Sequence, residues 1–339
     1  MSGASTSAGD WCDLLDPVRP ELLLPDVRRS DDPRLGEFVE IGLAGLRPGR
    51  AVIVGFPQDE GIRRNHGRPG TALAPDELRR FLFRLTPWDA ASDVDLAQTP
   101  PVDVGNLRIT PHLEQTQAEL ARVIEGVVRA GGIPVVLGGG HETALGHYLG
   151  YARAGRKLGI INIDAHLDVR PTVGGLGHSG SPFRECLEHP EHPLAGHAYV
   201  CLGAQPGNVS REHARYVLQR GGRIYWRHQA AGRLGECFGR ECQRLAELGC
   251  QTYVTVDADA MRVEQMPGVS APNPDGLEAG EVLGLVRRAG QTAQVAGLDL
   301  VEINPHHDRD CQCVRWGGLA LWHFLVGLAE REGQARTGK

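Results

Sequence analysis

Metal-binding residue types follow apolar runs in this chain. Asp-Ala-His-Leu-Asp at 164–168 comes directly after an apolar run that ends at Ile163. Residues two apart on an extended segment point to the same side, so Asp164, His166 and Asp168 can converge on one point. Carboxylates with a neutral imidazole bind a divalent cation, and without one such close carboxylates repel each other. The alternative is a helix N-cap cluster with a chance histidine.

Two further segments repeat this design. Asp257-Ala258-Asp259 follows the apolar run 253–256, and the run 133–137 opens into Gly-Gly-Gly-His-Glu at 138–142. A glycine turn or a lone histidine is usually structural, but three strand ends together deliver two histidines and four aspartates. In open α/β sheets, ligands bind outside the carboxyl ends of the strands. The sequence therefore predicts a metal centre formed by His141, Asp164, His166, Asp168, Asp257 and Asp259.

Strand and helix patterns alternate along the chain. Strands are expected near residues 51–56, 133–137, 158–163, 198–203, 223–226, 252–257 and 295–301. Helices are expected near 38–46, 75–85, 113–130, 142–153, 211–220, 233–248, 278–288 and 317–331. Several strands are apolar on both faces, as a sheet covered by helices requires. This predicts an α/β fold with three αβα layers and a mainly parallel sheet, as one domain over 36–339 after a loop-rich N-terminal extension, residues 1–35.

Composition excludes several classes of protein. The 339 residues carry a net charge of −6, which gives no basic surface for nucleic acid. The sequence contains no apolar stretch long enough for a membrane span and no signal-peptide pattern. Eight cysteines without a secretion signal predict a cytoplasmic protein with reduced thiols. The spacing of Cys311 and Cys313 is too short for a zinc pair, so they are interpreted as incidental thiols.

With these residues in hand, the chain resembles the ureohydrolase (arginase/agmatinase) superfamily. The resemblance rests on the motifs at 138–142, 164–168 and 257–259 and on Leu-Asp-Leu-Val-Glu-Ile-Asn-Pro at 298–305, which occur in family order. It implies an arginase-like fold from about residue 50 to 330. Within the superfamily, formimidoylglutamases are the most similar group. That similarity rests on the loops at 56–65, 178–184 and 267–272.

The resemblance implies two Mn²⁺ ions per subunit. One ion would bind His141, Asp164, Asp168 and Asp257; the other would bind Asp164, His166, Asp257 and Asp259. Asp164 and Asp257 would bridge the pair. A ligand set rich in carboxylate oxygen suits Mn²⁺ better than zinc. The implied reaction is attack of a metal-bridging hydroxide on an amidine carbon, a nucleophile that two metals supply near neutral pH.

The resemblance also implies roles in substrate binding and proton transfer. Glu302 matches the family glutamate that contacts the cationic end of the substrate; the alternative is a capping or surface carboxylate. His178 is the candidate general acid, with Ser179 or an ordinary loop histidine as alternatives. Arg170 is the first candidate for gripping a substrate carboxylate. Further candidates for substrate binding are Arg63, Arg64 and Arg184.

The predicted function is hydrolysis of N-formimidoyl-L-glutamate to L-glutamate and formamide, a step of histidine degradation. The alternatives are a ureohydrolase acting on a guanidino acid or on agmatine, and a non-catalytic module of the same fold. The segment 260–262 reads Ala-Met-Arg where many relatives have Asp-Pro, which is expected to change the pocket wall beside the second metal and leaves the exact substrate open. The expected partner is a small-molecule amidine, and relatives predict a homo-oligomer.

Overall fold

The computed structural model describes residues 11–23 and 31–337. Its main sheet has ten strands, and eight of them run in the order β1-β6-β3-β7-β12-β11-β8-β9 before the edge strand β10, while β2 pairs with β6. Only β1 is antiparallel to its neighbour among the described strands of this sheet. The strands are β1 (Leu15–Asp16), β2 (Glu40–Ile41), β3 (Ala51–Gly55), β6 (Val102–Leu107), β7 (Ile133–Leu137), β8 (Leu158–Ile163), β9 (Tyr199–Ala204), β10 (Arg223–Trp226), β11 (Gln251–Asp257) and β12 (Val295–Val301).

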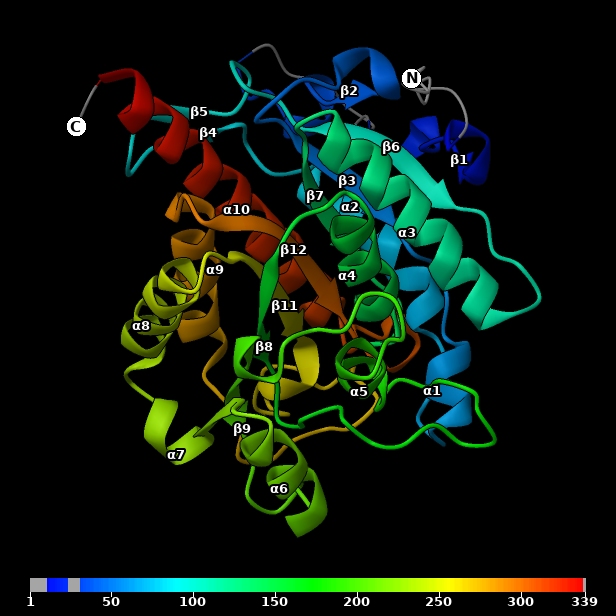
Figure 1. The fold of residues 1–339 in the computed structure, drawn as a ribbon. Coiled ribbons are helices and arrows are strands. Elements are labelled where there is room, and N and C mark those ends of the chain that lie inside the picture. The colour runs from blue at the N-terminus through cyan, green and yellow to red at the C-terminus, as the bar shows by residue number, and fades with distance from the viewer. Residues whose placement is uncertain (1–10, 24–30, 338–339) are drawn as a thin grey trace, which may run out of the picture.

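Helices cover both faces of this sheet, as Figure 1 shows. One layer contains α2 (Ala74–Leu82), α8 (Leu234–Glu247), α9 (Ala279–Gln291) and α10 (Gln312–Thr337). The other contains α3 (Leu113–Arg129), α4 (Thr143–Arg153) and α5 (Pro182–Leu187). Short helices α1 (Glu60–Arg64), α6 (Arg211–Gln219) and α7 (Arg227–Ala230) lie in the connections, and β4 (Trp88–Asp89) pairs with β5 (Val94–Asp95). The predicted three-layer α/β fold with a mainly parallel sheet is confirmed.

Four neighbouring strands at the centre of the sheet, β7, β12, β11 and β8, carry the site. Their side chains are buried almost throughout, because helices cover both faces. Val256 of β11 lies opposite Ile163 of β8 and Leu300 of β12, and Leu300 lies opposite Leu137 of β7. Since the strands are parallel and in register, the four segments that follow them begin at the same edge of the sheet.

The predicted helix over 38–46 is wrong. This segment forms β2 and the 3-10 helix Leu43–Gly45, with Gly42 between them in a left-handed conformation (φ 75°) that interrupts a helix. Glu40 pairs in register with Val102 of β6, and its carboxylate also binds Arg50. The strand β6 had not been predicted. Its Asp103 is fully buried in an ion pair with Arg79, a partner that the pattern of β6 alone could not reveal.

The predicted extension, residues 1–35, lies partly outside the described residues. The described part adds β1 to the sheet beside β6, and it buries Trp11, Leu15, Val18, Leu22 and Leu35 against the core. None of the described helices combines the length and apolar character needed to cross a membrane.

Candidate metal centre and adjoining pocket

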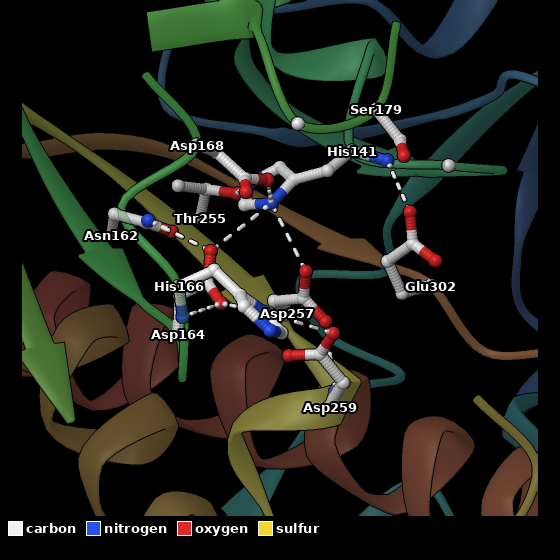
Figure 2. Close-up of polar contacts among 12 residues, drawn as sticks. His141, Asn162, Asp164, His166, Asp168, Ser179, Thr255, Asp257, Asp259 and Glu302 are labelled. Atoms are coloured by element: carbon white, nitrogen blue, oxygen red, sulfur yellow. Dashed lines mark hydrogen bonds and ion pairs between the residues drawn. The ribbon is translucent and has the colours of Figure 1, made fainter. Parts of the chain in front are cut away.

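His141 reaches the site on a glycine turn at the end of β7. A Cβ on Gly139 would stand 1.7 Å from the carbonyl oxygen of Gln58, so a larger residue cannot occupy this turn without a backbone shift. The Nε2 atom of His141 lies 3.1 Å from the hydroxyl oxygen of Thr255 on β11. A hydrogen bond from this nitrogen leaves Nδ1 as the free ligand atom, and Nδ1 faces three carboxylates (Figure 2).

The three carboxylates come from two different strand ends. Their oxygens lie 3.0, 3.1 and 3.4 Å from the Nδ1 atom of His141, and belong to Asp168, Asp257 and Asp164, respectively. Asp168 adopts a left-handed backbone conformation (φ 46°), which is uncommon for a residue other than glycine. Burial opposes a charge on His141, but the carboxylates outweigh this effect and raise its pKa well above the ordinary value.

His166 and Asp259 form a second group around Asp164. The Nδ1 atom of His166 lies 3.4 Å from a carboxylate oxygen of Asp164 and 3.4 Å from one of Asp259. Burial works against a charge on this ring, yet Asp259 and then Asp164 raise the pKa of His166 to about 12. Asp164 is held in place because it accepts hydrogen bonds from the Asn162 amide (3.0 Å) and the backbone N–H of His166 (2.7 Å).

All six predicted ligands therefore come together, in two overlapping sets. In each set the ligand atoms lie within 4.8 Å of one another, and Asp164 belongs to both sets. Asp257 falls in the set of His141 alone, although the resemblance placed it in both. One of its oxygens accepts the backbone N–H of Asp259 at 2.8 Å and caps the 3-10 helix Ala258–Ala260, while the other faces His141.

These side chains fit a pair of divalent cations. Burial and the neighbouring carboxylates of Asp259 and Asp164 raise the pKa of Asp257 well above its ordinary value, so the cluster retains protons when no cation balances its charge. The Nδ1 atom of His141 and one oxygen of Asp259 are buried and make no hydrogen bond within the described residues. A cation in each set of ligand atoms would give these two atoms a partner and displace those protons.

A pocket of about 220 Å³ opens beside this cluster. Glu302 reaches it from the residue after β12 in a left-handed conformation (φ 66°). One of its carboxylate oxygens accepts the backbone N–H of His141 at 2.9 Å, and the other is buried without a partner in the described residues. Burial is the main cause that raises the pKa of Glu302 to about 7. The pocket is lined by Asn65, His66, Gly67, His166, Asp168, Arg170, Ser179, Asp257, Asp259, Ser270, Ala271 and Glu302.

Of the four predicted arginines, Arg170 is the one that lines this pocket. Arg63 is exposed and forms an ion pair with Asp59. Arg64 binds Glu114 of α3, Glu60 and the carbonyl of Gly177. Arg184 donates to the carbonyl of Val169 and stacks on the ring of Tyr216. These three guanidinium groups hold loops and helices together, so the structure does not place them as substrate contacts.

His178, the predicted general acid, does not line the pocket either. Its Nδ1 atom accepts the backbone N–H of Gly180 at 3.1 Å, so its Nε2 atom donates to the carbonyl of Pro171 at 3.2 Å. Burial lowers the pKa of His178, which favours this neutral form. Because both ring nitrogens are engaged in bracing the loop between residues 171 and 180, the expected general-acid role is not supported. Ser179, the alternative at this place, does line the pocket.

Sequence reasoning missed the parts played by two residues, one in the pocket wall and one in the motif of His141. Asn65 lies in its wall and links Arg170 to Ser179. Glu142 is fully buried and accepts the backbone N–H of Gly61 at 2.9 Å, and burial together with Glu302 raises its pKa to about 8. The motif containing Glu142 was recognised, but its partner on α1 lies 81 residues away.

The altered segment 260–262 does not form the pocket wall that was expected of it. Ala260 and Met261 are buried, and Arg262 forms ion pairs with Glu264 and Glu278. None of these three residues lines the pocket, whereas Ser270 and Ala271 do. This departure therefore does not alter the pocket directly.

Comparison with known proteins agrees with this geometry. The model of the arginase family matches residues 49–326. The formimidoylglutamase of Geobacillus thermodenitrificans is 37% identical over 289 residues, which cover 81% of this chain and 84% of that protein.

Two solved structures are also similar. A crystal structure of Trypanosoma cruzi formiminoglutamase with Mn²⁺₂ has a TM-score of 0.80 and 32% identity, covering 89% of this chain and 100% of that one. The formimidoylglutamase of Bacillus subtilis has a TM-score of 0.84 over 90% of this chain and 94% of that one; at 21% identity it supports the fold alone. The resemblance found in the sequence is thus confirmed, and the chain belongs to the arginase family.

Proposed function

We propose that this protein hydrolyses the amidine C–N bond of N-formimidoyl-L-glutamate, giving L-glutamate and formamide. The observation that carries this proposal is the pair of opposite charges that one pocket offers. Glu302 contributes a buried carboxylate to its lining, and Arg170 contributes an exposed guanidinium. A substrate with a cationic amidine and carboxylates matches both groups. The similarity to formimidoylglutamases supports the same substrate.

We propose two Mn²⁺ ions as the cofactors. His141, Asp168 and Asp257 would hold one ion, His166 and Asp259 the other, and Asp164 would be shared, following the two sets of ligand atoms. When bound, such a pair lowers the pKa of water and polarises the amidine, which provides the nucleophile near neutral pH. Glu302 would bind and orient the amidine, and Arg170 would hold a carboxylate. The neutral His178 would keep the surrounding loop in place.

Mn²⁺ affinity should depend steeply on pH. In the absence of metal, the pKa of about 12 means that His166 carries a proton at neutral pH, and the raised pKa of Asp257 favours its protonated form. Bound metal must displace such protons. Binding should therefore strengthen as pH rises, by about tenfold per pH unit for each proton released. Calorimetric titration between pH 6 and 8, in buffers of different ionisation enthalpy, measures both the Mn²⁺ affinity and the number of protons released. An affinity that stays constant with no proton release would contradict this prediction.

The proposed function is tested by turnover of four compounds by the Mn²⁺-loaded protein. These are N-formimidoyl-L-glutamate, arginine, agmatine and 4-guanidinobutyrate. Release of glutamate and formamide from the first compound alone is expected. Release of urea from a guanidino compound would keep an arginase-family hydrolase but overturn the proposed substrate. No turnover of any compound by protein with two bound ions would point to the non-catalytic alternative.

A homo-oligomeric state and a cytoplasmic location stay predictions from the sequence. The eight cysteines are free thiols in the structure, and all but Cys12 and Cys311 are buried.

A further inference from the structure

We infer that Asn65 is a positioning residue that presents Arg170 and Ser179 as a ready-made binding site for a substrate carboxylate. This inference rests on the proposed function and deepens it. All three residues line the pocket beside the metal ligands. They come from three segments, the end of α1, the loop after β8 and the segment before α5.

Two hydrogen bonds fix the orientation of the Asn65 amide. The Nη1 atom of Arg170 donates to Oδ1 of Asn65 at 2.9 Å, and Nδ2 of Asn65 lies 3.0 Å from Oγ of Ser179. A guanidinium has donors only, so the oxygen of the amide must face Arg170. The amide nitrogen therefore faces Ser179, whose hydroxyl oxygen acts as the acceptor.

This arrangement leaves hydrogen-bond donors free. Because the Ser179 oxygen accepts from Asn65, its own hydrogen is available, and among the described residues its side chain donates to none. The Arg170 guanidinium uses one N–H on Asn65 and is exposed, so other N–H groups remain available. An arginine beside a hydroxyl donor suits a carboxylate, which accepts several hydrogen bonds. The ligand that Arg170 and Ser179 would bind is therefore a carboxylate group of the substrate.

The backbone supports the same three residues. A Cβ on Gly180 would lie 3.0 Å from Cδ of Arg170 and 3.1 Å from Nδ2 of Asn65, so this glycine gives the two side chains room to meet. The backbone N–H of Arg170 donates to the carbonyl of Gly180 at 2.9 Å, and that of Ser179 donates to the carbonyl of Gly61 at 3.1 Å. The donors are thus held before a substrate arrives, which reduces the entropic cost of binding.

Two variants of Asn65 test the inference. Asn65→Leu keeps the approximate volume and removes both hydrogen bonds. Asn65→Asp keeps an acceptor for Arg170, but its carboxylate draws the Ser179 hydrogen away from the pocket and neutralises the guanidinium. Gln115→Leu, on the exposed face of α3 where the amide binds Glu119, is the control for a polar-to-apolar change.

The variants are compared on substrates that differ by one carboxylate. N-formimidoyl-L-glutamate is measured against N-formimidoyl-4-aminobutyrate, which lacks the α-carboxylate, and N-formimidoyl-L-2-aminobutyrate, which lacks the side-chain carboxylate. Asn65→Leu should lower the preference for one of the two carboxylates by about tenfold or more, mainly through KM, and Asn65→Asp by at least as much. A merely structural role for Asn65 would reduce turnover of all three compounds equally, and that result would overturn the inference.

Failure of the proposed function gives a different result. If the wild-type protein cleaves no formimidoyl compound but cleaves arginine, the proposed function fails, and arginine against agmatine then tests the inference alone, because agmatine lacks the carboxylate. Calorimetric binding of L-glutamate to the Mn²⁺-loaded protein adds a readout without turnover. Weaker binding in Asn65→Leu, by about tenfold, supports the inference. Unchanged binding, or none to the wild-type protein, overturns it.

Discussion

Asp164→Ala should abolish binding of both metal ions and lower kcat/KM by at least about 10³-fold, since metal catalysis contributes several kcal/mol. Asp164 is the residue that both sets of ligand atoms share. Its two oxygens point to different histidines, each at 3.4 Å, one at His141 and one at His166. Removing it leaves each set without its central carboxylate. Elemental analysis after Mn²⁺ loading and gel filtration measures the loss.

A second variant, His166→Ala, tests more strictly whether Asp164 is shared by both metal ions. His166 belongs to one set only, so this variant should retain about one ion per chain, while Asp164→Ala retains none. Asp13→Ala, at an exposed aspartate far from the site in the chain, should bind metal like the wild-type protein. Two ions per chain in Asp164→Ala, or equal losses in the two site variants, would contradict the shared position of Asp164.

The six ligands could be predicted because their signal is local. Asp164, His166 and Asp168 directly follow an apolar run, and the glycines before His141 indicate a close backbone approach. The strand β8 ends at Ile163 and Asp168 is left-handed, so strand alternation alone does not set the direction of the Asp168 side chain. Parallel strands then bring their carboxyl ends to one edge. The sequence did not show that β7, β12, β11 and β8 are neighbours in the sheet. Nor did it show that one carboxylate oxygen of Asp257 accepts the backbone N–H of Asp259 while the other faces His141.

The substrate end of the pocket could not be predicted in the same way. Whether an arginine faces a substrate or another part of the protein depends on partners distant in sequence. Arg64 is occupied by Glu114, 50 residues away, whereas Arg170 is bound by Asn65, 105 residues away, and stays at the pocket. For His178, the nearby Gly180 takes one ring nitrogen, but a loop sequence does not reveal which way such a ring turns.

In the fold, too, elements with a strong local signal were predicted, and elements that depend on distant partners were missed. Long patterns such as 113–130 and 295–301 matched α3 and β12 closely, because amphipathic and continuously apolar runs are strong local signals. The segment 38–46 looked helical, but Gly42 and pairing with β6 gave a strand and a turn instead. The strand β6 was not recognised as a core strand because it contains the charged residue Asp103. The partner of Asp103 in a buried ion pair is Arg79 on α2, which the pattern of β6 does not show.

Glu302→Gln should lower kcat/KM by about 10²-fold or more while two Mn²⁺ ions remain bound. The amide keeps the shape of the side chain and an oxygen to accept the backbone N–H of His141, which holds Glu302 in position. What it loses is the charge on the second oxygen, the one that is buried without a partner in the described residues and lies at the pocket. Removing one partner of a buried, hydrogen-bonded charge pair costs about 2–5 kcal/mol, so a cationic amidine would bind and react less well.

The metal content separates this role from a structural one. The side chain of Glu302 belongs to neither set of ligand atoms, so the variant should match the wild-type protein in elemental analysis. If Glu302→Gln instead loses metal, the glutamate acts by holding His141 at the end of β7, because its carboxylate receives that backbone N–H. If both metal content and kcat/KM stay within about threefold of the wild-type values, a shift under 1 kcal/mol, the buried carboxylate does not bind the amidine. The left-handed conformation of Glu302 would then need another explanation, since a backbone of this kind persists only where its surroundings enforce it.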